Sequence, residues 1–223
     1  MGGYNYIFLS HIIETNSPSY GNRDVFENKL NSSFDKGDKS ESSDWHFSNN
    51  HFGTHVDAPS HFIKSANSIT DFDANFWLFK NIAIIELLCN EAKIISTEEI
   101  DFTKISDETE ILLIKTGYEN FRTERKYWEK NPGFAPDFGI KLKSKLPNLR
   151  AVGFDFISVT SYQYREYGKE AHISFLQGHL PVLPIEDMSL KNVGLTTIIK
   201  ELYVIPLRVD KANGSPVTVI AKL

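Results

Sequence analysis

Four residues that can bind a metal ion lie within a short stretch of the sequence: His51, His55, Asp57 and His61. Neutral imidazole nitrogens together with a carboxylate oxygen suit Zn²⁺, Mn²⁺ or a similar divalent ion. A surface loop whose histidines only form hydrogen bonds would explain any one of these residues. It does not explain all four at the spacing His-x3-His-x-Asp-x3-His, which therefore predicts a metal site.

An extended strand with a bend is the backbone conformation that could bring the side chains at this spacing to one ion. A helix would bring His51 and His55 together but would turn Asp57 to another face. A strand places all three on one face, because they are an even number of residues apart. A straight strand would hold His51 and His55 roughly 13 Å apart, at about 3.3 Å per residue. Gly53 can supply the bend between them, and Pro59 can fix the exit of the segment.

Short apolar runs bounded by turn residues indicate the strands that must position this segment. We expect strands at Ile82–Cys89, Glu110–Lys115, Ala151–Val159 and Leu202–Val209, with a fifth at Val217–Leu223. Helix signals lie between them, and we expect helices starting at Ser96, over Pro136–Leu146 and over Lys191–Lys200. Strands that alternate only in part with helices predict an α/β fold with a mixed sheet, in a single domain over residues 1–223.

The segment Asn31–Asn50 is rich in Ser, Asp, Lys and Asn and poor in apolar residues. This composition predicts a surface loop. The loop would directly precede His51, so it could act as a lid over the metal site, and Trp45 within it could line a pocket. A solvated loop without such a role fits the composition equally well. For the other two tryptophans, Trp77 and Trp128, packing is the safer expectation.

The overall composition argues against some classes of binding partner. A net charge of −5 argues against nucleic acid and against an anionic membrane surface, since both usually bind a basic face. The sequence shows no secretory signal and no apolar run near the roughly 18 residues that a membrane helix needs. We therefore expect a cytoplasmic protein. The single cysteine, Cys89, lies in an apolar run and is expected to be a buried thiol.

The metal-binding segment also resembles a known signature. Residues His51–His61 match His-x-Gly-Thr-His-x-Asp-x-Pro-x-His, the signature of the cyclase family of metal-dependent hydrolases, at every fixed position. That family includes bacterial kynurenine formamidases and isatin hydrolases. Three further segments are similar to family motifs, namely Phe8–His11, Ile114–Gly117 and Val152–Ser158, so the resemblance covers nearly the whole chain. It implies a swivelling β/β/α fold, in agreement with the mixed sheet.

The resemblance implies a ligand set for one or two ions per subunit. His51, His55 and Asp57 would hold one metal. His172 would hold a second metal, with Asp57 and Glu186 bridging the two ions. Zn²⁺ is the first expectation for the metal, and Mn²⁺ is the alternative. The family context of His172 and Glu186 is similar to the expected pattern, although the gap between them is about two residues longer than usual.

Further residues take roles by the same resemblance. His61 would be the proton donor and acceptor rather than a ligand. Tyr20 stands where the formamidases commonly have a substrate-facing tryptophan, which puts an arylformamide substrate in doubt. His179 is a rival to the later histidine ligand, but it lacks a matching context. Asp155, at the end of a predicted strand, could orient a metal-binding histidine or could cap the strand.

The chemistry that follows is hydrolysis with metal-activated water, acting on an amide, a formamide, a cyclic amide or a lactone. No Gly-x-Ser-x-Gly motif, P-loop or Gly-x-Gly-x-x-Gly motif supports a serine nucleophile or a nucleotide cofactor. Two alternatives stay open: a cyclase or dehydratase of the same family, and a metal-containing binding protein without turnover. The expected partner is a small-molecule substrate, and the family implies a homodimer or homotetramer.

Overall fold

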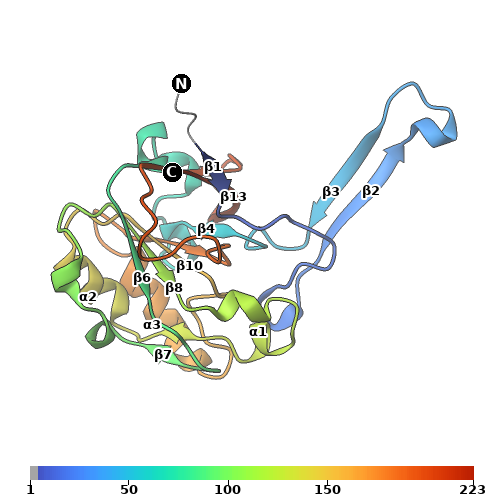
Figure 1. The fold of residues 1–223 in the computed structure, drawn as a ribbon. Coiled ribbons are helices and arrows are strands. Elements are labelled where there is room, and N and C mark those ends of the chain that lie inside the picture. The colour runs from blue at the N-terminus through green and yellow to red at the C-terminus, as the bar shows by residue number, and fades with distance from the viewer. Residues whose placement is uncertain (1–4) are drawn as a thin grey trace.

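The computed structural model describes residues 5–223, and its centre is a nine-stranded mixed sheet (Figure 1). The strand order is β5-β12-β13-β4-β11-β10-β8-β6, and β1 pairs with β13 off this path. The nine strands are β1 (Tyr6–Phe8), β4 (His55–Asp57), β5 (Leu78–Phe79), β6 (Ile82–Glu86), β8 (Ile111–Lys115), β10 (Ala151–Phe154), β11 (Leu183–Glu186), β12 (Glu201–Pro206) and β13 (Gly214–Lys222).

The sheet has a parallel half and an antiparallel half. Strands β6, β8, β10 and β11 run parallel to one another, and β8 and β10 are almost wholly buried, as expected for strands covered on both faces. The pairs β11–β4, β4–β13, β13–β12 and β12–β5 are antiparallel. The short strand β4 therefore lies at the seam between the two halves.

The α-helices are α1 (Lys126–Glu129), α2 (Phe138–Lys145) and α3 (Arg165–Leu176). Helices α2 and α3 pack against each other, and α3 also contacts β11. None of the helices among residues 5–223 is long and apolar enough to cross a membrane. Two short strands, β7 (Ile94–Ile95) and β9 (Gly133–Phe134), pair in parallel, and α3 contacts β9. This packing holds α3 beside the seam of the sheet.

Short 3₁₀ helices occupy many of the connections. They are η1 (Tyr20–Asn22), η2 (Phe34–Lys36), η3 (Pro59–His61), η4 (Ile69–Asp71), η5 (Ala74–Trp77), η6 (Thr97–Glu99), η7 (Phe102–Lys104) and η8 (Tyr118–Phe121). The helix signal at Ser96 corresponds to η6, where Ser96 and Glu99 form a capping box. The predicted helix is therefore only a single 3₁₀ turn, and the backbone leaves the helical conformation at Ile100.

The predicted mixed α/β fold is confirmed. All five apolar runs contain strands, namely β6, β8, β10, β12 and β13, and α2 lies within the predicted helix Pro136–Leu146. The helix expected over Lys191–Lys200 was wrong, because this segment is a series of turns. The backbone N–H of Gly194 donates to Thr197 Oγ1 at 3.0 Å, and the glycine and the β-branched residues after it have low helix propensity.

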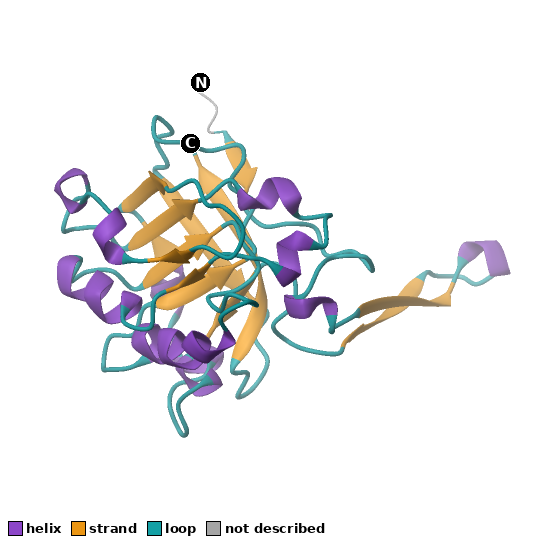
Figure 2. Ribbon diagram, turned by 90° about the horizontal axis from the view of Figure 1, so that it is seen from below, coloured by secondary structure: helices purple, strands orange, loops and turns teal. Residues whose placement is uncertain are grey.

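The loop expected over Asn31–Asn50 was also wrong. Strands β2 (Phe26–Ser32) and β3 (Ser42–Phe47) form an antiparallel hairpin, closed by η2, that extends away from the body (Figures 1 and 2). We call residues 26–47 the arm. Most of its side chains are exposed, so its composition resembles that of a loop although its backbone is paired. It does not fold over the body as a lid.

The close packing of α2 on α3 generates one prediction. A Cβ on Gly139 of α2 would lie 2.4 Å from the backbone nitrogen of Phe175 in α3. Alanine usually stabilises a helix relative to glycine, but here we expect Gly139→Ala to lower the free energy of unfolding by about 1–3 kcal/mol through overpacking. Chemical denaturation would measure this, with exposed Lys145→Ala in the same helix as the control. A Gly139→Ala variant as stable as the wild type would contradict the observed approach.

Candidate metal centre

The bend and the strand that the sequence predicts are both present. Gly53 has φ +63°, a left-handed conformation that glycine adopts without strain, and β4 begins two residues later. His55 and Asp57 lie on the same face of β4, with His55 Nε2 3.6 Å from Asp57 Oδ1. Both side chains are almost fully buried. The short extended strand therefore brings an imidazole and a carboxylate to one point.

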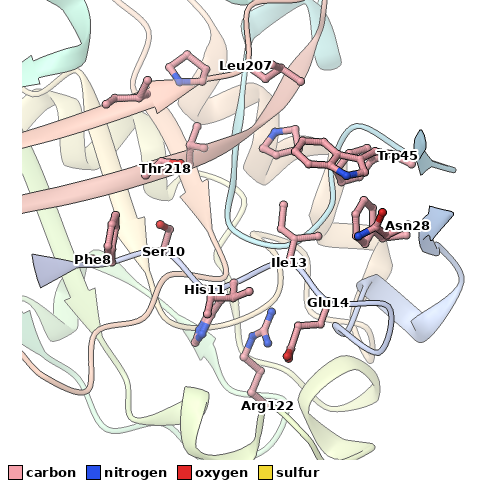
Figure 3. A pocket seen from close by; sticks show the side chains of 17 residues that line it. Phe8, Ser10, His11, Ile13, Glu14, Asn28, Trp45, Arg122, Leu207 and Thr218 are labelled. Atoms are coloured by element: carbon pink, nitrogen blue, oxygen red, sulfur yellow. The ribbon is translucent and has the colours of Figure 1, made fainter. Parts of the chain in front are cut away.

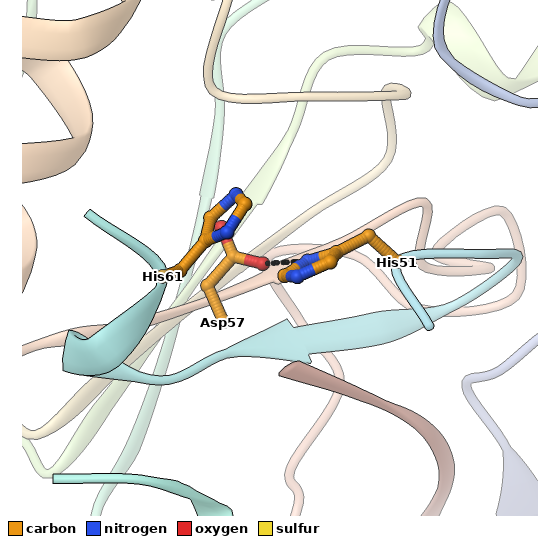
Figure 4. Close-up of side chains that lie close together, drawn as sticks. All are labelled: His51, Asp57 and His61. Carbon is orange, nitrogen blue, oxygen red and sulfur yellow. Dashed lines mark hydrogen bonds and ion pairs between the residues drawn. The ribbon is translucent and has the colours of Figure 1, made fainter. Parts of the chain in front are cut away.

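His51 and His61 reach the same carboxylate from the two ends of the segment. His51 Nδ1 lies 2.7 Å from Asp57 Oδ1. Pro59 begins η3, which carries His61 back over the strand, so that its ring stacks on His51 with centroids 3.9 Å apart. Figure 4 shows both histidines turned toward Asp57. All four residues of the motif therefore meet in space.

The later histidine and glutamate come from α3 and β11. His172 Nε2 lies 3.5 Å from Asp57 Oδ2 and 3.7 Å from Glu186 Oε1. The antiparallel register of β4 and β11 places Glu186 opposite His55, and Glu186 Oε2 is 3.3 Å from His55 Nε2. His179 is exposed in the turn after α3, so the structure brings His172 to the site and leaves His179 outside it.

Two groups of three residues could each hold an ion, and Asp57 belongs to both. His51, Asp57 and His61 form one group, and Asp57, His172 and Glu186 form the other, with the candidate ligand atoms of each group within 4.8 Å of one another. The second group matches the set that the family resemblance implies. In the first, His61 occupies the place expected for His55, which instead lies between the two carboxylates.

The donor atoms fit a divalent cation. His55 Nδ1 donates to the Gly53 carbonyl at 2.8 Å, and His172 Nδ1 donates to the Gly168 carbonyl at 2.7 Å. These bonds orient each ring so that Nε2 faces the carboxylates, as is usual for metal-binding histidines. Asp57 Oδ2 is buried and has no hydrogen-bond partner among the described residues. An unpaired buried carboxylate oxygen is costly unless a cation neutralises it.

Charges inside the cluster hold both carboxylates ionised. Burial would raise the pKa of Asp57, but His51 holds that pKa well below its ordinary value. Burial would lower the pKa of His55, but Glu186 and Asp57 raise it to about 9. His61 differs, because burial lowers its pKa to about 4. A cation would thus replace protons held by His55, whereas His61 is already neutral at pH 7.

The cluster opens into a cavity of about 370 Å³. Tyr20, Asn50 and Phe62 contribute to its wall. The Tyr20 hydroxyl is buried without a hydrogen-bond partner in the described part of the chain, and burial raises its pKa to about 12. Tyr20 therefore offers a neutral hydroxyl at the position where the sequence predicts a substrate contact. Trp77 and Trp128 pack against the core instead.

A buried ion pair that the sequence did not predict lies directly after the ligand-bearing strand β11. Asp187 follows Glu186 and is fully buried, and Arg122 donates to its carboxylate from Nε at 2.9 Å and from Nη2 at 2.7 Å. Thr54 Oγ1 donates to the Asp187 carbonyl at 2.6 Å, just before His55. An acidic residue directly after a predicted ligand was the signal that could have revealed it.

The role considered for Asp155 in orienting a histidine was wrong. Its carboxylate accepts from the backbone nitrogens of Thr116 and Gly117, both at 2.8 Å, and so caps the turn after β8. Glu186 is supported instead by the backbone nitrogen of Val159, which donates to Oε1 at 2.7 Å. A strand-end aspartate satisfies nearby backbone donors without reaching the metal cluster.

The geometry places His172, and not His179, among the candidate metal ligands. We expect His172→Ala to weaken Zn²⁺ or Mn²⁺ binding by at least about 10-fold, since even an outer partner of a ligand contributes about that much. His179→Ala should leave binding unchanged, because that side chain is exposed. Competition with a chromogenic chelator and elemental analysis would measure both. Equal loss in the two variants, or loss only in His179→Ala, would contradict the assignment.

The buried Arg122–Asp187 pair gives a second prediction. Arg122→Met leaves a fully buried carboxylate without its cation, so we expect the free energy of unfolding to fall by about 3–5 kcal/mol. Arg125→Met removes an exposed pair with Glu129 and should change it by at most about 1 kcal/mol. Urea denaturation of both variants provides the comparison. Similar stabilities of the two variants would show that the buried pair contributes no more to stability than the exposed one.

Comparisons with known proteins agree with this arrangement. The chain is 29% identical over 233 residues to Cyclase-like protein 2 of Oryza sativa subsp. japonica, covering 98% of this chain and 79% of that protein. It is 27% identical over 167 residues to the kynurenine formamidase of Geobacillus thermodenitrificans, covering 75% and 73% of the two chains. Isatin hydrolase A from Labrenzia aggregata shares the fold with a TM-score of 0.79, at 19% identity and 99% and 94% coverage.

A family model also matches this chain. The family model named Cyclase matches residues 7–161, which is more than half of the chain and contains the whole His51–His61 segment. The chain therefore belongs to the Cyclase family.

Proposed function

We propose that this protein is a divalent-metal-dependent hydrolase that opens an amide, a formamide, a cyclic amide or a lactone. The observation that carries the proposal is the meeting of His55, His172, Asp57 and Glu186 at the base of a cavity of about 370 Å³. A cavity of this size suits a small molecule. The kynurenine formamidases among its relatives and the isatin hydrolases that share its fold support this reaction class.

The side chains divide the work of hydrolysis between them. Histidine nitrogens and carboxylate oxygens would hold Zn²⁺ or Mn²⁺, and two groups that share Asp57 have room for one or two ions. A bound divalent ion supplies water of lowered pKa and polarises a carbonyl group. Asp57 and Glu186 are already ionised, so they would neutralise the charge of the cation without first losing protons.

His61 is proposed to move the proton. Its ring stacks on His51 and lines the cavity, so a substrate bound there would lie within its reach. In hydrolysis the imidazole takes a proton from the attacking water and returns it to the leaving nitrogen or oxygen. Its position against His51 disfavours a binding protein without turnover, which would have no need of a histidine beside the open cavity.

Tyr20 is proposed to contact the substrate. Tyr20 lines the cavity, and its neutral hydroxyl, which has no hydrogen-bond partner among the described residues, could donate to a carbonyl or ring oxygen. Phe62 lies on the wall and stacks on His172 with centroids 4.3 Å apart. A planar substrate could lie between such aromatic walls. The tyrosine at this position favours testing cyclic amides and lactones alongside arylformamides.

The test of the function is a hydrolysis panel on metal-loaded protein. We expect wild type to hydrolyse at least one of N-formylkynurenine, isatin and simple lactones with Zn²⁺ or Mn²⁺. His61→Ala should keep its metal and lose about 10²–10⁴-fold in kcat, because only the proton transfer is removed. Elemental analysis and steady-state kinetics give the two readouts.

His46→Ala is the matched control, because His46 is an exposed histidine of the arm. It should leave both metal content and kcat unchanged. Loss of metal in His61→Ala would make His61 a ligand, as its group with His51 and Asp57 allows. Wild type that is inactive on the whole panel would count against plain hydrolysis and favour a cyclase or dehydratase.

A further inference from the structure

The ring of His51 is held differently from the rings of His55 and His172. Those two histidines each donate from Nδ1 to a backbone carbonyl, which leaves Nε2 facing the carboxylates. His51 has the reverse orientation, with Nδ1 2.7 Å from Asp57 Oδ1. Its Nε2 lies 3.2 Å from the side-chain oxygen of Asn213, which is not one of the candidate ligands. The contact with Asn213 decides which nitrogen of His51 carries a hydrogen.

The hydrogen bonds around Asn213 fix the tautomer of His51. Asn50 Nδ2 lies 2.7 Å from the carbonyl oxygen of Gly214, which can only accept, so Asn50 places its amide nitrogen there. The same nitrogen donates its second hydrogen to Asn213 Oδ1 at 2.9 Å. Asn213 therefore presents its oxygen, and not its amide nitrogen, to His51 as well. That oxygen accepts a hydrogen from His51 Nε2, so Nδ1 is the nitrogen whose lone pair is free to bind a cation.

Backbone pairing holds Asn213 beside the cluster. The N–H of Ala58 donates to the Asn213 carbonyl at 2.9 Å, and Gly214 is the register partner of Asp57 in the β4–β13 pair. The side-chain oxygen that accepts from His51 is thus positioned relative to the Asp57 carboxylate by the pairing of these two strands.

Packing confines the ring of His51. A Cβ on Gly214 would lie 2.2 Å from Cε1 and 2.7 Å from Nδ1 of this ring, so the ring fills the space that a side chain at position 214 would need. His61 stacks on His51 with an interplanar angle of 28° (Figure 4). The glycine therefore leaves the space in which the ring contacts Asn213 and Asp57 at once.

The contact lies in the wall of the metal cavity. Asn50, His51 and Asn213 all line this cavity of about 370 Å³. Trp45, which the sequence suggested could line a pocket, lines a separate groove of about 1000 Å³, where Figure 3 shows it across from Ile13. None of Asn50, His51 and Asn213 belongs to that groove. A substitution of Asn213 therefore alters the lining of the metal cavity and leaves the lining of the groove unchanged.

We infer that Asn213, supported by Asn50, is a positioning residue that makes His51 a metal ligand through Nδ1. His51 would then bind the ion through the opposite nitrogen from that of His55 and His172. The inference rests on the metal centre of the proposed function, but not on any reaction at that centre. Outer partners that orient metal-binding histidines contribute about 10- to 100-fold to metal affinity, and we expect Asn213 to contribute within this range.

The first test is the affinity for Zn²⁺, measured by competition with a chromogenic chelator. Asn213→Ala removes the acceptor and should raise the Kd of Zn²⁺ by about 10- to 100-fold. Asn213→Asp keeps an oxygen acceptor for His51 Nε2 and should restore most of the affinity. Asn148→Ala is the matched control and should bind as wild type does, because Asn148 is an exposed asparagine whose amide donates to the Asp107 carbonyl. Thermal melting of the metal-free proteins would show that all of them are folded.

The second test identifies the binding nitrogen of His51 by NMR of the Zn²⁺-loaded protein with ¹⁵N-labelled histidine rings. Nδ1 of His51 should show the resonance of a metal-bound nitrogen, and Nε2 should show an N–H signal that exchanges slowly with water. His55 and His172 should show the opposite assignment, and the spectrum of His51→Gln identifies which signals belong to His51. In Asn213→Ala the Nε2 hydrogen should exchange faster, because its acceptor is gone. A general loss of stability would not change which nitrogen binds.

Four results would overturn the inference. Wild type that binds no Zn²⁺ would leave no metal for His51 to bind, and a metal-bound Nε2 in His51 would reverse the assignment. Asn213→Ala with wild-type affinity would show that the contact is not needed. Asn213→Asp that binds as weakly as Asn213→Ala would show that the oxygen acceptor is not what matters. None of these readouts is turnover, so a wild type that binds Zn²⁺ but hydrolyses no substrate of the panel would contradict the proposed function alone.

Discussion

The Asp57 carboxylate is the constraint around which the rest of the structure is arranged. It is buried in the middle of the sheet, and His51 lies 2.7 Å from one of its oxygens. The other oxygen has no hydrogen-bond partner within residues 5–223. Leaving an anion in such a place costs several kcal/mol unless opposite charge surrounds it. His51, His55 and His172 each place a ring nitrogen within 3.6 Å of it, and a second carboxylate, Glu186, lies 3.3 Å from His55.

The sheet supplies these groups because its two halves meet at β4. His55 and Asp57 come from β4, and Glu186 comes from its antiparallel neighbour β11. Helix α3 packs beside β11 and carries His172. Each of these elements is short, so the positions of the candidate ligands depend on contacts between elements rather than on the length of any one element. The Arg122–Asp187 pair and the bond from Thr54 to the Asp187 carbonyl fix the strand ends on which the ligands stand. His55, Asp57, His172 and Glu186 thus stand on regular strands and a helix rather than on loops.

The sequence predicted correctly those elements that have a strong hydrophobic pattern or a characteristic ligand spacing. The apolar runs of β8 and β10 are buried on both faces and are easy to recognise, and the bend at Gly53 follows from the ligand spacing. Pro184 and Pro216 lie inside paired strands, where proline argues against a strand, so β11 was expected only from family resemblance.

The remaining errors have physical causes of the same kind. The arm was mistaken for a loop because a ribbon that buries little has the composition of a loop. The position of Asp187 beside a predicted ligand was a signal, but its partner Arg122 lies far away in the chain, and no local pattern identifies that partner. Which histidines bind a metal is equally a matter of three-dimensional distance, so spacing could nominate His51, His55 and His61 but could not divide their roles.

The three-residue length of β4 has a consequence for the cohesion of the whole molecule. So short a strand has few backbone hydrogen bonds with which to join the parallel and antiparallel halves. A cation held between Asp57 on β4, Glu186 on β11 and His172 on α3 would act as a cross-link whose occupancy depends on the free metal concentration. Metal supply in the cell would then set the lifetime of the folded protein as well as the fraction that is ready to work.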